Sequence, residues 1–200
     1  MRRLVMFNNI SLDGYFTDVH GDMSWARTDW DAEWAEFAFG NARDGGLLLF
    51  GRVTYDLMAG YWPTPAAKQG EPELAKCMNA LPKVVFSRKI SRADWNNTTL
   101  IKDDPVEAVR RLKRESGPGM AVLGSGRIVA QLAAAGLIDE YQFAVIPMAL
   151  GAGRTLFEGL PRPLHLKLKS LRAFRNGNVV LSYERGPNYR GRLQAITPQR

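Results

Sequence analysis

The chain has 200 residues, of which 46% are hydrophobic, and it carries a formal net charge of +7. This length and apolar content are typical of one folded domain with a sizeable core, and they exclude a disordered chain. No apolar run is long enough to span a membrane, and the N-terminal run is too short for a signal peptide.

The cysteine and histidine content argues against disulfide and metal chemistry. The single Cys77 cannot form an internal disulfide, so we expect a cytoplasmic protein. The two histidines, His20 and His165, lie far apart without cysteine partners at ligand spacing. We therefore predict no metal site.

The positive charge is concentrated at the C-terminal end. Four of the seven excess positive charges come from Arg185, Arg190, Arg192 and Arg200, in a stretch that has no acid. The glycines and prolines of residues 186–200 predict a loosely ordered tail after a domain over 1–185. No basic helix with interleaved aromatic residues is present, so binding to nucleic acid is the least favoured interpretation.

The first half of the chain alternates predicted strands and helices. Asp31 is a candidate cap for a helix whose inner face carries Trp34, Phe37, Ala38 and Asn41. The loop before it is long enough to suggest a function. We predict, in order, a strand at 3–10, a loop at 11–30, helices at 32–43 and 52–58 flanking a strand at 47–50, an irregular segment at 59–73, a helical turn or two at 74–80, and strands at 83–87 and 98–101.

The second half continues this alternation and ends in a hairpin. Asp104-Pro105 opens a helix to about residue 115, because proline is favoured at the first helical position. The period-two pattern at 164–174 predicts a strand with one solvent-exposed face, and Asn176-Gly177-Asn178 predicts a hairpin turn. We also expect a strand at 120–123, a helix at 126–135, and strands at 138–147 and 179–184. The order predicts an α/β domain with a mixed central sheet.

Two strand-to-helix junctions carry the signals of anion-binding sites. Gly124 and Gly126 lie between an apolar run and a helical pattern, and glycine permits a tight turn and a close approach by a ligand. The first N–H groups of a helix have no partner in the chain, so a phosphate is favoured there. The second junction has Gly51, Arg52 and Thr54. Two such sites suggest a dinucleotide, although turn glycines and a solvated arginine are the simpler alternative.

Five segments occur in an order that resembles the dihydrofolate reductase-like superfamily. The similarity is greatest to the branch with the reductase domain of riboflavin biosynthesis, the RibD C-terminal domain, and it covers about residues 1–185. The segments are Ser11-Leu12-Asp13-Gly14-Tyr15, Leu49-Phe50-Gly51-Arg52-Val53-Thr54-Tyr55, Pro82-Lys83-Val84-Val85-Phe86-Ser87-Arg88, Leu123-Gly124-Ser125-Gly126 and Ile146-Pro147-Met148-Ala149-Leu150-Gly151-Ala152-Gly153.

The resemblance implies a three-layer fold with a mostly parallel sheet and an antiparallel C-terminal hairpin, and it implies NADPH as cofactor. In that family the matching positions hold the coenzyme's adenosine side, 2′-phosphate, pyrophosphate and nicotinamide. For this chain the resemblance assigns Gly51, Arg52 and Thr54 to the adenosine side, Ser87 and Arg88 to the 2′-phosphate, Gly124, Ser125, Gly126, Arg127 and Ile128 to the pyrophosphate, and Asp13 and Gly14 to the nicotinamide.

The resemblance also implies a substrate and a partner state. Ser24 corresponds to a substrate-facing serine and Trp25 to a cofactor-facing tryptophan, although packing in a small cluster is an alternative for Trp25. We expect hydride transfer to a small pterin- or pyrimidine-like heterocycle, as in 5-amino-6-(5-phosphoribosylamino)uracil reductase. The proton would come from water, Asp13 or Ser24. We expect a homodimer, with no nucleic-acid or membrane partner.

The chain departs from this family at the substrate side. Riboflavin reductases usually have a glutamate where this chain has Leu123. Folate reductases carry a carboxylate on the first helix, but Asp31, Glu33 and Glu36 are not clearly on the inner face here. A non-catalytic module that binds NADPH or another nucleotide therefore remains the alternative to a reductase.

Overall fold

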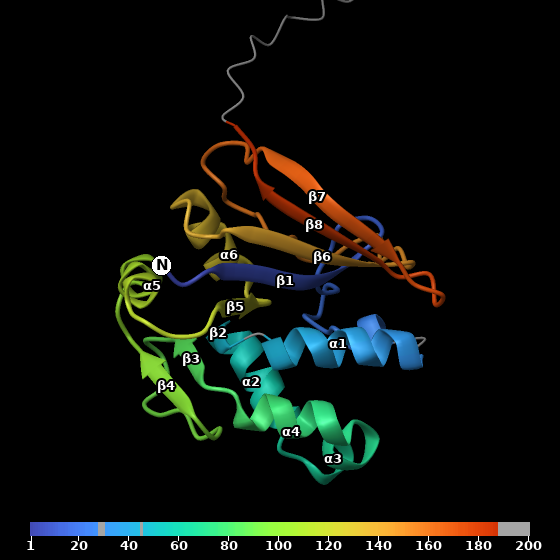
Figure 1. Cartoon of the computed structure of the whole chain (residues 1–200), viewed down its shortest axis with the longest axis horizontal. Coiled ribbons are helices and arrows are strands. Elements are labelled where there is room, and N and C mark those ends of the chain that lie inside the picture. The colour runs from blue at the N-terminus through green and yellow to red at the C-terminus, as the bar shows by residue number, and fades with distance from the viewer. Residues whose placement is uncertain (28–30, 45, 188–200) are drawn as a thin grey trace, which may run out of the picture.

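An eight-stranded sheet forms the centre of the structure, a computed structural model that describes residues 1–27, 31–44 and 46–187. The strand order is β4-β3-β2-β5-β1-β6-β8-β7 (Figure 1). The first six strands of this order are parallel, and β8 and β7 complete the sheet by antiparallel pairing. The strands are β1 (Leu4–Ser11), β2 (Leu47–Gly51), β3 (Lys83–Phe86), β4 (Thr98–Ile101), β5 (Met120–Leu123), β6 (Glu140–Ile146), β7 (Leu166–Ala173) and β8 (Val179–Arg185).

Helices cover both faces of this sheet. The helices are the 3-10 turn η1 (Ser24–Arg27), α1 (Ala32–Asp44), α2 (Arg52–Tyr61), α3 (Pro65–Gly70), α4 (Pro72–Ala80), α5 (Pro105–Arg114) and α6 (Gly126–Ala134). Helices α5 and α6 share one hydrophobic cluster with the sheet, whereas α1 to α4 contribute to two clusters on the other face. The predicted three-layer fold with a mixed sheet is therefore confirmed.

Local sequence signals start the helices as predicted. The Oδ1 of Asp31 accepts a hydrogen bond from the N–H of Trp34 at 2.8 Å, at the start of α1. Asp104 caps α5 by accepting from the N–H groups of Val106 and Glu107. Each carboxylate satisfies donors that have no partner inside the helix.

The prediction that 59–73 is irregular was wrong. Helix α2 continues to Tyr61, and α3 and α4 begin at Pro65 and Pro72. Proline lacks an N–H, and the first residue of a helix does not need one, so these prolines open helices here. The Oγ1 of Thr64 supports the start of α3 by accepting from the N–H of Ala67.

The predicted alternation along the C-terminal edge strand was also wrong. Strand β7 is exposed along nearly its whole length, and its Leu168 and Leu171 are 46% and 63% exposed. The pairing with β8 shifts between Leu168 and Ser170, which breaks the period of two. The edge position of β7 leaves it without a covering layer.

Strand β1 separates from β5 partway along its length. The two strands pair from Leu4 with Met120 to Phe7 with Leu123, whereas β1 stays paired with β6 as far as Ser11. The connections that leave β1 and β5 also run in opposite directions along the sheet. Ligands of open α/β sheets bind at such a switch point, at the carboxyl ends of the strands.

No helix among the described residues is both long enough and apolar enough to cross a membrane. Residues 28–30, at the end of the loop predicted at 11–30, and residues 188–200 of the predicted basic tail lie outside the described residues.

Candidate functional site

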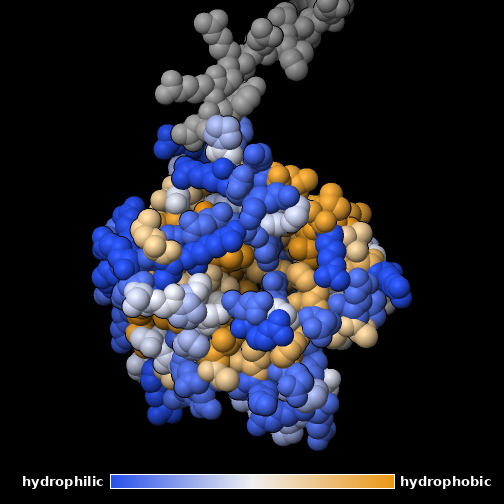
Figure 2. All heavy atoms as spheres, in the orientation of Figure 1, coloured by the Kyte–Doolittle hydropathy of each residue, from blue (hydrophilic) through white to orange (hydrophobic). Residues whose placement is uncertain are grey.

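A cavity of about 400 Å³ lies between α1 and the sheet. On the face seen in Figure 2, hydrophobic atoms surround a hollow between the sheet and the helices below it. The predicted inner-face residues Ala38 and Asn41 line the cavity, whereas Glu33 and Glu36 lie in a separate outer groove. The wall is completed from β1, β5, α2, α4 and the loops, and includes Phe7, Asn8, Asn9, Met23, Thr54, Met58, Trp62, Leu74, Met78 and Leu123.

Four predicted residues are held together where β2 and β5 end. The N–H of Gly51 donates to the Oγ of Ser125 at 2.8 Å, and this hydroxyl donates to the Oγ1 of Thr54 at 2.9 Å. A Cβ on Gly51 would stand 2.7 Å from Ser125 Oγ, and one on Gly124 would stand 2.7 Å from Thr54 Oγ1. The starts of α2 and α6 are therefore held side by side, and the close approach requires both glycines.

Both of these helices begin without a side-chain cap. The N-cap residues Gly51 and Ser125 make no side-chain capping hydrogen bond to their own helices, and the first N–H groups of a helix lack intrahelical acceptors. Both starts therefore favour anions. Arg52 opens α2 and pairs with Asp56 at 2.8 Å while its side chain stays 40% exposed. Its guanidinium remains accessible to a second anionic partner.

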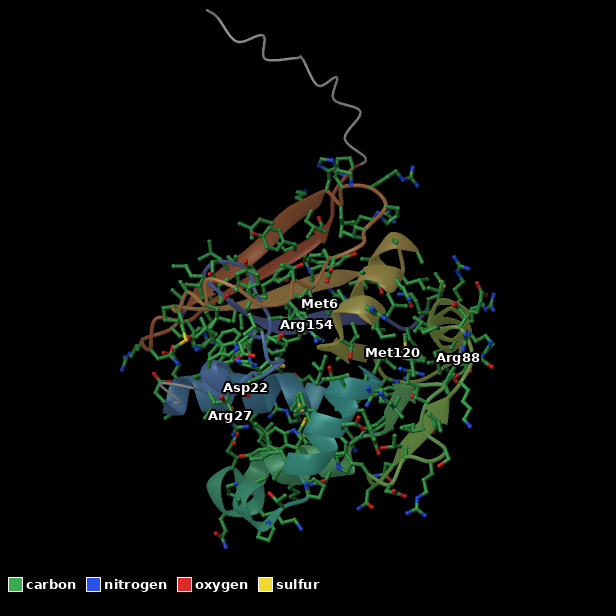
Figure 3. All side chains as sticks on the ribbon, turned by 180° about the vertical axis from the view of Figure 1, so that it is seen from behind. Met6, Asp22, Arg27, Arg88, Met120 and Arg154 are labelled. Carbon is green, nitrogen blue, oxygen red and sulfur yellow. The ribbon has the colours of Figure 1, made fainter. Side chains whose placement is uncertain are left out.

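The predicted residues Ser87 and Arg88 follow β3 at the same edge of the sheet. Arg88 donates through Nε to the carbonyl of Lys102 at 3.2 Å and is exposed. Figure 3 shows Arg88 on one side of the molecule and Arg27 on the other, with Met6 and Met120 between them. Only an extended ligand could contact both Arg88 and the centre of the sheet.

Asp13 holds the end of β1 against the segment that follows β6. Its carboxylate accepts from the Ser11 hydroxyl and from the N–H groups of Leu150 and Gly151, at 2.6, 3.1 and 2.7 Å. These hydrogen bonds, the one from Ser11 first, lower the pKa of Asp13 to about 2. The carboxylate is ionised at neutral pH, so its geometry suits positioning better than proton donation. Gly14 follows with a φ of 89°, in the turn beside it.

Ser24 and Trp25 lie apart from the cavity wall. The Ser24 hydroxyl donates to the carboxylate of Asp22, and this bond lowers the pKa of Asp22. Trp25 is 8% exposed and packs in the cluster that contains Trp34 and Phe174. Trp25 therefore packs in the protein interior, its contact with a cofactor stays a prediction, and Met23 of this loop lines the cavity.

Sequence reasoning missed two neighbouring asparagines in the cavity wall. Asn8 and Asn9 are the first residues of β1 beyond its pairing with β5, and the Oδ1 of each is buried without a hydrogen-bond partner among the described residues. Alternate strand residues point to opposite faces. The Asn8 amide donates to the Met6 sulfur on the face of the sheet that α5 and α6 cover. The Asn9 side chain lies on the opposite face, which α1 covers and which also carries Phe7. Consecutive polar residues in an apolar strand were the available signal.

Arg154 is a third residue that the sequence did not reveal. Its backbone pairs with that of Thr17, and a Cβ on Gly126 would stand 3.1 Å from the carbonyl of the next residue, Thr155. The segment that carries Arg154 therefore packs against the first residue of α6. Its side chain is exposed, and it forms no ion pair within the described part of the chain. Because this segment packs on Gly126, the guanidinium adds positive charge on the α6 side of the site.

No group of three or more histidine, cysteine, aspartate or glutamate side chains that could hold a metal ion occurs among the residues described by the structure. Apart from the Asp13 carboxylate, the polar groups described for the site are N–H donors, guanidinium groups, hydroxyls and amides. Such groups suit phosphate and carboxamide ligands.

Comparison with known proteins identifies the family. The model of the RibD C-terminal domain matches residues 2–180. The chain therefore belongs to the RibD C-terminal domain family.

Relatives and solved structures agree with this assignment. The uncharacterized protein YyaP of Bacillus subtilis is 30% identical over 182 residues, which cover 91% of this chain and 94% of YyaP. A protein of Shewanella sp. PV-4, provisionally assigned to riboflavin biosynthesis, has a TM-score of 0.70 at 20% identity and covers 92% of this chain and 99% of its own. Dihydrofolate reductase from Enterococcus faecalis, complexed with NADP(H), has a TM-score of 0.61 at 13% identity, with 92% and 97% covered. These structures confirm the dihydrofolate reductase-like fold.

Proposed function

We propose that this protein is an NADPH-dependent reductase of a small heterocyclic compound, related in reaction to the pyrimidine reductases of riboflavin biosynthesis. Membership of the RibD C-terminal domain family supports an oxidoreductase. The shared fold with a dihydrofolate reductase complexed with NADP(H) supports the choice of coenzyme. The reaction would use the hydride of the bound nicotinamide, so the chain needs no nucleophile of its own.

One observation carries this proposal. The hydrogen bonds from Gly51 to Ser125 and from Ser125 to Thr54 hold two uncapped helix starts together, next to the place where β1 leaves β5. Two adjacent anion-binding helix starts suit a ligand with phosphates at separate positions. The switch point beside them suits the ring that such a ligand carries.

Different residues would bind different parts of the coenzyme. The α6 start and Arg154 would hold the pyrophosphate, and Arg52 with the α2 start would hold the 2′-phosphate. The buried amide of Asn8, whose Oδ1 has no partner among the described residues, would accept a hydrogen bond from the nicotinamide carboxamide. The apolar wall of the cavity, including Phe7 and Leu123, would exclude water from the transfer.

Calorimetry and a turnover assay test this function. The purified chain is titrated with NADPH and NADH, and coenzyme oxidation is then followed by absorbance with dihydropterin, aminouracil and quinone acceptors. We expect NADPH to bind and at least one acceptor to cause oxidation. Failure to bind either coenzyme would reject the proposal. Tight binding without oxidation would instead favour a non-catalytic nucleotide-binding module.

A further inference from the structure

The charge of the cavity wall restricts what can bind beside the coenzyme. Among the described lining residues, only Arg3 and Asp44 carry full charges. Arg3 donates to the carboxylate of Glu140, and Asp44 accepts from Arg43 at 3.1 Å. Both charges are therefore already paired within the protein.

These charges also lie at the end of the cavity far from the switch point, where the coenzyme would bind. Arg3 precedes β1 and Asp44 ends α1, so both lie at the amino ends of the parallel strands. The switch point lies at the carboxyl ends, where the wall consists of apolar, amide and hydroxyl side chains, all of them neutral. A phosphate dianion placed in this wall would lose water without gaining a cation, which is strongly unfavourable.

The polar groups that remain available are neutral. Thr54 already accepts a hydrogen bond from Ser125, and the Gln142 amide already donates one to Glu140. Asn9 keeps a buried Oδ1 with no partner in the described structure on the sheet wall, and Asn41 offers its amide from α1 on the opposite wall. A buried acceptor without a partner costs free energy, which a ligand donor would recover.

From this arrangement we propose that the cavity selects an uncharged, non-phosphorylated heterocycle, and that Asn9 recognises a ring N–H or amino group of that heterocycle. This inference rests on the proposed reductase function and specifies its substrate class. The reducible carbon of a C=N bond receives the hydride, the electron pair of the π bond moves to the nitrogen, and the nitrogen takes a proton from water. The products are the amine and NADP⁺.

A matched pair of probes measures the effect of a phosphate group on binding and turnover. The pair is 5-amino-6-(ribosylamino)uracil and its 5′-phosphate, which share the uracil ring and, once the ribose ring opens to the imine, the reducible C1′=N bond. We measure kcat/KM with NADPH for both, and calorimetric binding of both to the complex of the protein with NADP⁺. We expect the unphosphorylated probe to be favoured by about tenfold or more. Preference for the phosphate, or binding of neither probe, overturns the inference.

Variants of the two amides test the recognition of the ring. Asn9→Leu removes the acceptor at nearly constant size, and Asn41→Leu does the same on the opposite wall. For Asn9→Leu we expect kcat/KM for the unphosphorylated probe to fall about tenfold or more, while the NADPH affinity and the melting temperature are retained. Retained kcat/KM in Asn9→Leu would remove this residue from substrate recognition. If the unaltered protein does not bind NADPH, the result would instead count against the reductase function itself.

Discussion

Gly51 and Ser125 are joined by a hydrogen bond of 2.8 Å that links the end of β2 to the start of α6. The space between them is so small that a methyl group on Gly51 would stand 2.7 Å from the Ser125 oxygen. Ser125 itself has a φ of 61°, a conformation that non-glycine residues rarely adopt. The strain and the close packing occur where the two helix starts meet.

Gly51→Ala should therefore destabilise the protein through Ser125. We expect a loss of about 1–3 kcal/mol in the free energy of unfolding, because the added methyl group overpacks the junction. Ser125→Gly removes the obstructing atoms, so the double variant should lose less than the sum of the single variants. Urea denaturation of the four proteins measures this coupling.

Gly60→Ala is the matched control for that cycle. Gly60 lies in α2, and no atom lies within 4 Å of the position that an added methyl group would take. Alanine is the better helix former, so the control should be neutral or more stable by about 0.5–1 kcal/mol. Additive effects of the Gly51 and Ser125 substitutions would contradict the proposed contact.

The sequence predicted those features of the site that depend on local signals. The glycines at 51 and 124 and the arginine at 52 mark strand-to-helix turns, and the structure shows α2 and α6 beginning there. The caps Asp31 and Asp104 were also evident, because capping depends on residues within one turn.

The remaining features depend on contacts between distant segments. The importance of Asn8 and Asn9 arises because β5 ends its pairing with β1 at Phe7, and no local pattern encodes that register. Trp25 is buried in a cluster with Trp34 and Phe174, segments distant in the sequence, and its contact with the coenzyme stays a prediction. Arg154 gains its position from the packing of its loop against α6.

Arg52→Ala should discriminate between the two coenzymes. Loss of a charge-assisted hydrogen bond to the 2′-phosphate should weaken NADPH binding by about 1.5–3 kcal/mol, and NADH binding should change little. Arg110→Ala is the control, because Arg110 is also an exposed helical arginine paired with a nearby acid, Glu107. Calorimetric titration with both coenzymes measures the effect, and equal losses for NADPH and NADH would refute the role of Arg52.

Asp13→Asn should loosen the segment after β6 without changing the pH dependence of turnover. The pKa of about 2 keeps Asp13 ionised at neutral pH, so it has no proton to donate there. Its bonds to the N–H groups of Leu150 and Gly151 should weaken in the variant, and these amides should exchange hydrogen faster. If the turnover rate of the unaltered protein falls as the pH rises through one pKa, and Asp13→Asn abolishes this fall, Asp13 would be identified as a proton donor.

Tyr141→Phe should leave the protein equally stable or more stable. The Tyr141 hydroxyl is fully buried without a hydrogen-bond partner in the described structure, and burial raises its pKa to about 12. Its removal relieves an unsatisfied polar group, for a gain of up to about 1 kcal/mol.

Tyr55→Phe is the matched contrast to that substitution. The Tyr55 hydroxyl accepts from the N–H of Trp95 at 3.0 Å, so its removal leaves a buried donor unpaired, at a cost of about 1–3 kcal/mol. Thermal unfolding compares the two variants. Equal destabilisation of both would show that Tyr141 has a partner after all.

Glu140→Gln should destabilise the protein at neutral pH and lose this effect in acid. Burial of Glu140 raises its pKa, but hydrogen bonds from Lys169, Ser182 and Gln142 and the charge of Arg3 together lower it from 4.5 to about 2. Between these values the unfolded chain binds more protons than the folded protein, so the stability from Glu140 is present above about pH 4.5 and is lost as the pH falls toward 2. The full contribution is about 3 kcal/mol at most.

The free energy of unfolding, measured by urea denaturation at several pH values, should therefore separate the unaltered protein from Glu140→Gln at neutral pH. The two curves should converge near the acid end of this range. Glu184→Gln provides the control, because Glu184 forms an exposed pair with Lys167 at 3.8 Å, worth about 0–1 kcal/mol. A difference between the unaltered protein and Glu140→Gln that stays constant from neutral to acidic pH would show that the carboxylate charge is not what stabilises this cluster.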